Sequence, residues 1–143
     1  MIAEIVAQIA DQLETVFDAS DYEIAVWPYM LFNPSTTAVD IYPDDPFRDA
    51  PTGGMGDVNG GYRFVVRART GLTDLDSGQL ILLDLMDDNS DVCVATAVAD
   101  DTTLGGLAAD VFVGDPSGFQ AFVATEGTMV GVTWPVLVLA AES

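Results

Sequence analysis

The charge of this chain is strongly one-sided. It has 23 acidic residues, four arginines and neither lysine nor histidine, which gives a formal net charge of −19. Half of its residues are nevertheless hydrophobic. Such a chain must keep its carboxylates in water and bury its apolar residues together, because an ionised carboxylate is costly to bury without a partner. Its 143 residues suffice for one domain with a substantial core.

The same composition narrows the chemistry. Without histidine or lysine there is no side chain with an ordinary pKa near neutrality and no amine for a Schiff base. Cys93 stands alone, so it forms no internal disulfide and offers no zinc site; we expect it to be a small core residue. The net charge argues against binding to DNA phosphates and to anionic membranes. The composition therefore predicts a protein that binds or assembles, with no catalytic residues, cofactor or metal.

Hydrophobic periodicity predicts an N-terminal helix. Apolar residues recur at spacings of three and four between Ile2 and Phe17, which places them along one stripe of a helix. Two short extended segments follow, at 22–27 and 37–42, separated by proline-containing chain. We expect the helix to pack on a sheet through its apolar stripe.

The second half of the chain predicts strands and two further helices. Alternating residues from Tyr62 to Arg69 indicate a strand. The remaining elements are expected at 74–87 and 91–100 as helices, and at 108–113, 119–125 and 128–139 as strands. The whole predicts a single α+β domain over 1–143, with a small mixed, mainly antiparallel sheet on which the N-terminal helix and a helical pair pack. Pro135 has no N–H, so it should lie at an edge or a bulge.

Residues 43–61 combine three prolines, five glycines and four aspartates. This composition predicts one long mobile loop, and loops of that length in compact domains are often functional. Phe47, Met55 and Val58 are isolated apolar residues in it and are candidate anchors for a partner protein. A flexible loop without a function is the alternative interpretation, and the sequence does not distinguish the two.

Three of the four arginines share one face of the 62–69 strand. Arg63, Arg67 and Arg69 alternate with apolar residues, so their side chains leave the same side of the sheet. One interpretation is a solvated face paired with aspartates of the same chain. The other is a basic stripe that meets an acidic surface of another subunit, since the arginine fork suits carboxylates. Both remain open from the sequence.

Motifs for metal, phosphate or acid–base chemistry are incomplete. The segment 87–91 begins like a calcium loop but lacks the glycine and glutamate that an EF-hand requires at its sixth and twelfth positions. The glycine-rich segment 53–61 lacks the lysine of a phosphate-binding loop. The pairs Asp44/Asp45 and Asp74/Asp76 are expected to be exposed carboxylates with ordinary acidity.

The order of these elements resembles that of the tail terminator proteins of long-tailed phages, also called tail completion or minor tail proteins. The resemblance rests on the strand at 62–70 that leads into the 74–87 helix, on the turn at 101–107 and on the closing strand at 131–138. It implies a hexameric ring at the head-proximal end of the tail tube. That ring ends tube polymerisation and joins the tail to the head connector, without an enzymatic step.

The resemblance also implies partners and a location. The partners would be further copies of the chain, the tail tube protein and the head–tail connector, with DNA passing through unbound and no membrane involved. The ring would be assembled in the host cytoplasm and would reside in the virion tail. Alternative functions are a head-to-tail adaptor or neck protein, a tail tube subunit and, more remotely, a carboxylate-dependent hydrolase.

Overall fold

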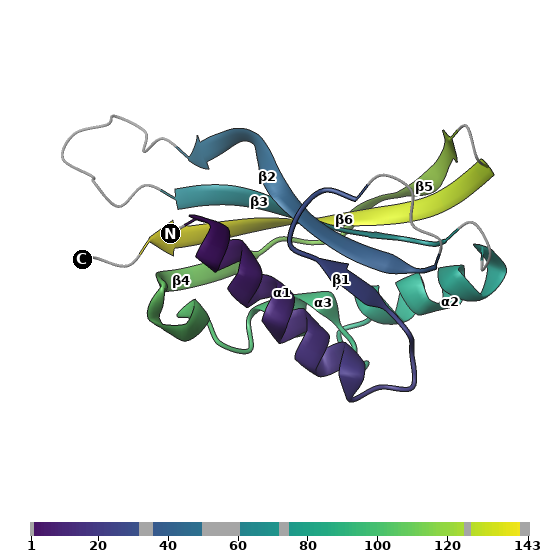
Figure 1. The fold of residues 1–143 in the computed structure, drawn as a ribbon, viewed down its shortest axis with the longest axis horizontal. Helices are drawn as coiled ribbons and strands as arrows, with labels where there is room; N and C mark the ends of the chain where they lie inside the picture. Colours follow the sequence, from purple (N-terminus) through teal and green to yellow (C-terminus); the bar gives the residue numbers. More distant parts are fainter. Residues whose placement is uncertain (1, 32–35, 50–60, 72–74, 125–126, 141–143) are drawn as a thin grey trace.

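A computed structural model describes residues 2–31, 36–49, 61–71, 75–124 and 127–140. The described chain has an α+β architecture, in which three α-helices and a 3-10 turn accompany a six-stranded, mostly antiparallel sheet (Figure 1). The elements are α1 (Ile2–Asp18), β1 (Ala25–Trp27), β2 (Ala38–Asp49), β3 (Gly61–Arg69), α2 (Leu75–Met86), α3 (Val94–Val98), η1 (Leu104–Gly106), β4 (Ala108–Val113), β5 (Ser117–Ala124) and β6 (Gly127–Ala140). Among the described helices, none has both the length and the hydropathy to span a membrane.

The long strand β6 is the centre of the sheet. The strand order is β1-β2-β3-β6-β4, and β5 also pairs with β6. One side of β6 pairs with β3, while β4 and β5 follow one another along its other side. All pairs are antiparallel except β1 with β2. The two ends of the sheet are therefore β1 on one side and the β4 and β5 strands on the other.

The helices cover one face of this sheet. In α1 the apolar stripe buries Ile5, Ile9, Leu13 and Phe17, as the periodicity predicts. These side chains join alternate residues of the strands in one core, namely Val39, Ile41, Phe64, Val66, Ala68, Val132, Trp134, Val136 and Val138. The buried Gln12 amide donates to the backbone carbonyls of Ala97 and Val98 at 3.3 and 2.9 Å, which ties α1 to the end of α3.

The prediction of a loop at 43–61 is wrong for residues 43–49, which belong to a strand. Strand β2 continues to Asp49, and a register shift between Pro43 and Arg48 accommodates the two prolines, which cannot donate ladder hydrogen bonds. The sequence suggested a loop because prolines and aspartates interrupt the alternation of apolar and polar residues that is usual in a strand. Residues 50–60 lie outside the described chain.

Pro135 lies in the central strand, not at an edge, and opposite Val65 of β3. A strand residue directs its N–H and C=O to the same side, and the Pro135 carbonyl accepts a hydrogen bond from the Gly114 N–H at 2.8 Å. The position where Pro135 lacks an N–H therefore lies opposite the gap between the end of β4 and the start of β5, so no strand requires a hydrogen bond from it. The sequence pattern did not predict that the last strand is central, because this depends on long-range pairing.

Gly78 fixes the approach of α2 to the sheet. A Cβ at this position would lie 2.8 Å from the Thr37 hydroxyl oxygen and 2.8 Å from a methyl carbon of Thr70. We expect Gly78→Ala to lower the free energy of unfolding by about 1–2 kcal/mol, because overpacking costs more than the roughly 1 kcal/mol that alanine adds in helix propensity. Urea unfolding measures this, with the exposed Leu80→Ala as control. A Gly78→Ala variant as stable as the wild type would contradict this packing.

Candidate functional site

The arginines of β3 meet an aspartate of the neighbouring strand. The register of β2 with β3 places Asp40 opposite Arg67. One oxygen of the Asp40 carboxylate accepts from Arg67 Nε at 3.1 Å, and the other accepts from Arg67 Nη2 at 2.5 Å and lies 3.6 Å from Arg69 Nη2. The Asp40 side chain is 1% exposed. We call these three residues the Asp40 cluster.

The chain that follows β1 covers the Asp40 cluster. The Leu31 N–H donates to Asp40 at 3.0 Å, while the Leu31 carbonyl accepts from Arg67 Nη2 at 3.1 Å and from Arg69 Nη2. The Arg67 guanidinium also lies over the Tyr42 ring, 4.9 Å from its centroid. Burial, followed by the neighbouring Arg67, lowers the pKa of Arg69, and Asp40 opposes this. The cluster thus holds the β1–β2 connection against the sheet.

This geometry divides the three arginines that the sequence placed on one face. Arg67 and Arg69 are engaged with Asp40 of the same chain, as in the first of the two interpretations. Arg63 is 41% exposed, and its closest described carboxylate, that of Asp44, is 3.9 Å away. A contact between these arginines and another subunit stays a prediction. Replacing Arg67 and Arg69 with glutamate would test it poorly, because a buried cluster of carboxylates would unfold the chain.

The three apolar residues of the predicted loop have different positions. Phe47 is half-buried in β2, where its ring lies 5.3 Å from both Tyr62 and Phe64, and it packs against the core. Met55 and Val58 lie outside the described residues. Their expected role as tail-partner anchors remains a prediction.

A groove with acidic lining lies between the ends of α1 and α2. Its volume is about 700 Å³, and Tyr22 crosses it to donate a hydrogen bond to the Asp84 carboxylate. This hydrogen bond, more than burial, raises the pKa of Tyr22, because ionising the phenol would place two negative charges together. Within the described chain, no group of cysteine and acidic side chains could hold a metal ion. The acidic residues that line the groove are Asp21, Asp84 and Asp91.

The aspartate pairs of the sequence lie apart from this groove. Asp44 and Asp45 are neighbours near the end of β2, and the Asp45 N–H donates to the Asp44 carboxylate at 2.8 Å. Asp74 lies outside the described residues, so its pair with Asp76 is not placed. Nothing in the described chain orients the Asp44 and Asp45 carboxylates toward a shared reacting atom.

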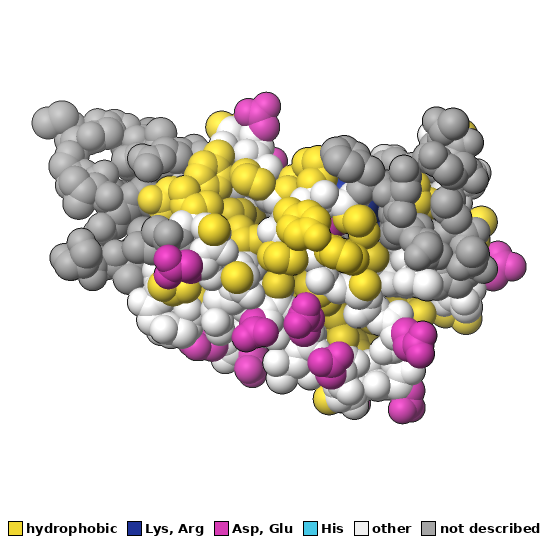
Figure 2. All heavy atoms as spheres, viewed as in Figure 1, with side chains coloured by type: hydrophobic (Ala, Val, Ile, Leu, Met, Phe, Trp, Pro, Cys, Tyr) yellow, Lys and Arg dark blue, Asp and Glu magenta, His cyan; other side chains and the backbone are white. Residues whose placement is uncertain are grey.

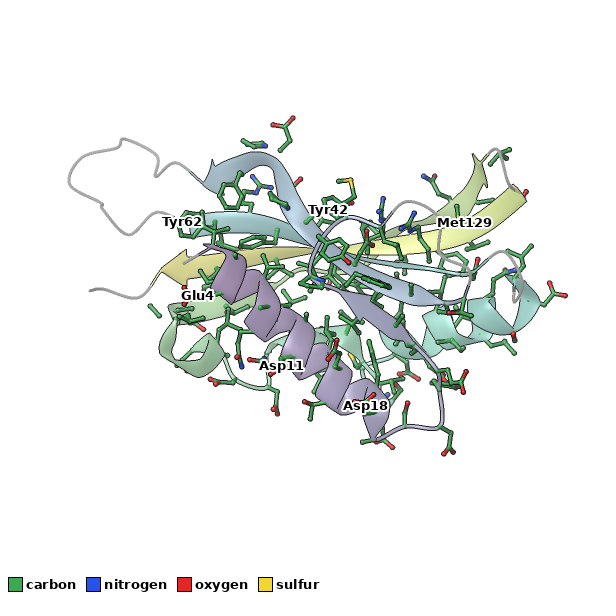
Figure 3. The ribbon with its side chains drawn as sticks, viewed as in Figure 1. Glu4, Asp11, Asp18, Tyr42, Tyr62 and Met129 are labelled. Atoms are coloured by element: carbon green, nitrogen blue, oxygen red, sulfur yellow. The ribbon has the colours of Figure 1, made fainter. Side chains whose placement is uncertain are left out.

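Charge is distributed unevenly over the surface. Glu4, Asp11 and Asp18 recur every seven residues on the exposed side of α1 (Figure 3). Figure 2 shows acidic side chains over the helical part of this face and hydrophobic side chains gathered over the β2–β3 part and the chain after β1. On this face the acidic residues thus concentrate over the helices.

Sequence reasoning missed two uncharged segments that contain the strands at opposite ends of the sheet. Residues 24–39, which include β1, and 116–125, which include β5, contain no charged residue. Each carries exposed large side chains, namely Tyr29 and Met30 in the first and Phe119 and Val123 in the second. The signal was available as long gaps in an otherwise frequent pattern of charged residues, but a third such gap, at 127–141, contains the central strand β6. Only the strand order distinguishes them, because it places β1 and β5 at the two sheet ends.

Comparison of the chain with known protein families finds no match, and comparison with curated proteins finds none.

Proposed function

We propose that this protein is a structural component of a phage virion, which forms a ring at the head-proximal end of the tail tube. In this role it ends tube polymerisation and then joins the tail to the head connector. The observation that carries the proposal is a pair of different uncharged surfaces with exposed apolar side chains, one at the edge of β5 and one in the chain after β1. Two different surfaces of a subunit that bind each other make head-to-tail contacts, and such contacts close into rings when the rotation between subunits is suitable.

The charge distribution supports the same role. Copies of a chain with a net charge of −19 repel one another, and this repulsion is weakest where the two facing surfaces lack acidic residues. This restricts self-association to defined surfaces. A ring with acidic walls would also repel DNA, so that a genome would pass through it without being retained.

A tail tube subunit is the second candidate, and the open strand edge of β5 favours it. A tube subunit would polymerise by itself, whereas a terminator would stop at one ring. A head-to-tail adaptor would also form a ring but would bind the connector in place of the tube. The three functions therefore differ in what the purified protein does alone and in which partner it binds.

The test is polymerisation of the tail tube protein from the same phage, followed by electron microscopy with and without this protein. We expect tubes to stop elongating and to carry a ring at one end, at far less than one copy of this protein per tube subunit. Tubes that elongate unchanged and carry no ring would overturn the proposal. Long tubes from this protein alone would favour the tube subunit.

A further inference from the structure

Strand β5 has an open edge. Among the described strands it pairs with β6 alone, so the N–H and C=O groups of its other edge have no strand partner. Residues 117–121 and Val123 of β5 are exposed, and Val123 is 86% exposed. In Figure 1 the β5–β6 hairpin forms one end of the molecule. We call this hairpin the β5 arm.

The sequence of β5 lacks the usual protection of an edge strand. Proteins shield open edges with charged side chains, prolines or bulges, because a flat apolar edge pairs with other chains. Strand β5 contains neither a charged residue nor a proline, and its register shift lies at its beginning, between Ser117 and Gln120. In a chain with 23 acidic residues, this unprotected edge indicates a surface that is covered in the assembled protein.

The other exposed hydrophobic residues are flanked by acidic residues. Leu80 and Leu83 lie on α2 between Asp76 and Asp84, and Phe112 lies between Asp110 and Asp115. A second copy of this acidic chain would be repelled from those sites. Phe119 and Val123 lie instead in an uncharged run of ten residues, 116–125, which Asp115 and Glu126 bound, and Tyr29 and Met30 lie in a longer uncharged run, 24–39.

The surface after β1 is firmly held in place. Trp27 and Tyr29 contact each other with ring centroids 5.6 Å apart. Leu31 is bound on both its N–H and its C=O by the Asp40 cluster. Exposed apolar residues on a fixed backbone cost little conformational entropy to bind, so they suit an interface.

We propose that the β5 arm of one copy docks on the Tyr29–Met30 surface of the next copy, with Phe119 and Val123 as its apolar contacts. The contact joins two different surfaces of the chain, the edge of β5 and the segment after β1 that lies against β2 and β3, and is therefore head-to-tail. The contact itself does not depend on the proposed function. Only the closure of successive contacts into a ring rests on that function.

Disulfide trapping tests the contact in a Cys93→Ala background. Val123→Cys and Tyr29→Cys chains are prepared separately, mixed and mildly oxidised, with and without the tail tube protein. We expect a covalent heterodimer in the mixture. Each variant oxidised by itself should give no covalent dimer. With both substitutions on one chain, a ladder of oligomers should form. The matched control replaces Val123→Cys with Leu80→Cys, also strongly exposed, and should give no adduct above background.

Val123→Lys gives an independent readout by placing a charge on the open edge, while Leu80→Lys serves as control. We expect Val123→Lys, but not Leu80→Lys, to shift native mass spectra from oligomer to monomer. A homodimer of the Val123→Cys chain alone would overturn the head-to-tail contact, since it would show β5 meeting β5. Rings of unchanged mass with Val123→Lys would also overturn it, but would leave the proposed function standing. Failure of the wild type to cap tubes would refute the function instead.

Discussion

Replacing Asp40 with alanine is expected to lower the free energy of unfolding by about 3–5 kcal/mol. The carboxylate is 1% exposed and holds the guanidinium groups of Arg67 and Arg69. Its removal would leave Arg69, whose side chain is 8% exposed, without its closest described carboxylate. Since domains are stable by about 5–15 kcal/mol, the loss would be a large share of the total. Urea unfolding followed by fluorescence measures it.

The control for this prediction is the exposed ion pair on the same two strands. Asp44 and Arg63 are 3.9 Å apart, with side chains 29% and 41% exposed. Asp44→Ala should cost about 0–1 kcal/mol, because solvent screens such a pair. If the two aspartate variants lose equal stability, the Asp40 cluster does not hold the sheet together as we describe.

Trp134→Ala is expected to have an effect of similar size, about 3–5 kcal/mol. Trp134 is among the largest fully buried side chains, and it lies on the central strand opposite Val66. Its removal would open a cavity under the helices. Because strands pair with β6 on both of its sides, the surrounding backbone cannot readily move in to fill that cavity. The midpoint of urea unfolding, followed by circular dichroism, reports the loss. Trp27→Ala, in the short edge strand β1, should cost less; an equal or larger loss there would contradict a core centred on β6.

Local sequence patterns predicted the helices and most strands because local physics determines them. The apolar stripe of α1 and the alternation in β3 each depend on neighbours within a few residues. The extension of β2 to Asp49 was missed because Phe47 is held by Tyr62 and Phe64, contacts that local composition does not reveal. Pro135 was misplaced for the same reason, since its position depends on which strands pair with β6.

The candidate site was less predictable than the fold. Alternation places Arg67 and Arg69 on one face, but the choice between a partner in the chain and one in another subunit needs the β2–β3 register that brings Asp40 opposite Arg67. The uncharged segments are visible in the sequence, yet only the strand order shows that their strands, β1 and β5, lie at opposite ends of the sheet. Long-range pairing thus supplied what local patterns could not.

The central claim is that copies of this chain close into a ring on the tail tube. Sedimentation velocity of the purified protein, alone and with tail tube protein, tests it most directly. We predict one oligomeric species of discrete size, formed alone or on addition of tube protein, with a mass that matches six copies if the ring is hexameric. A protein that sediments as a monomer at every concentration, and does not co-sediment with tubes, would contradict the account.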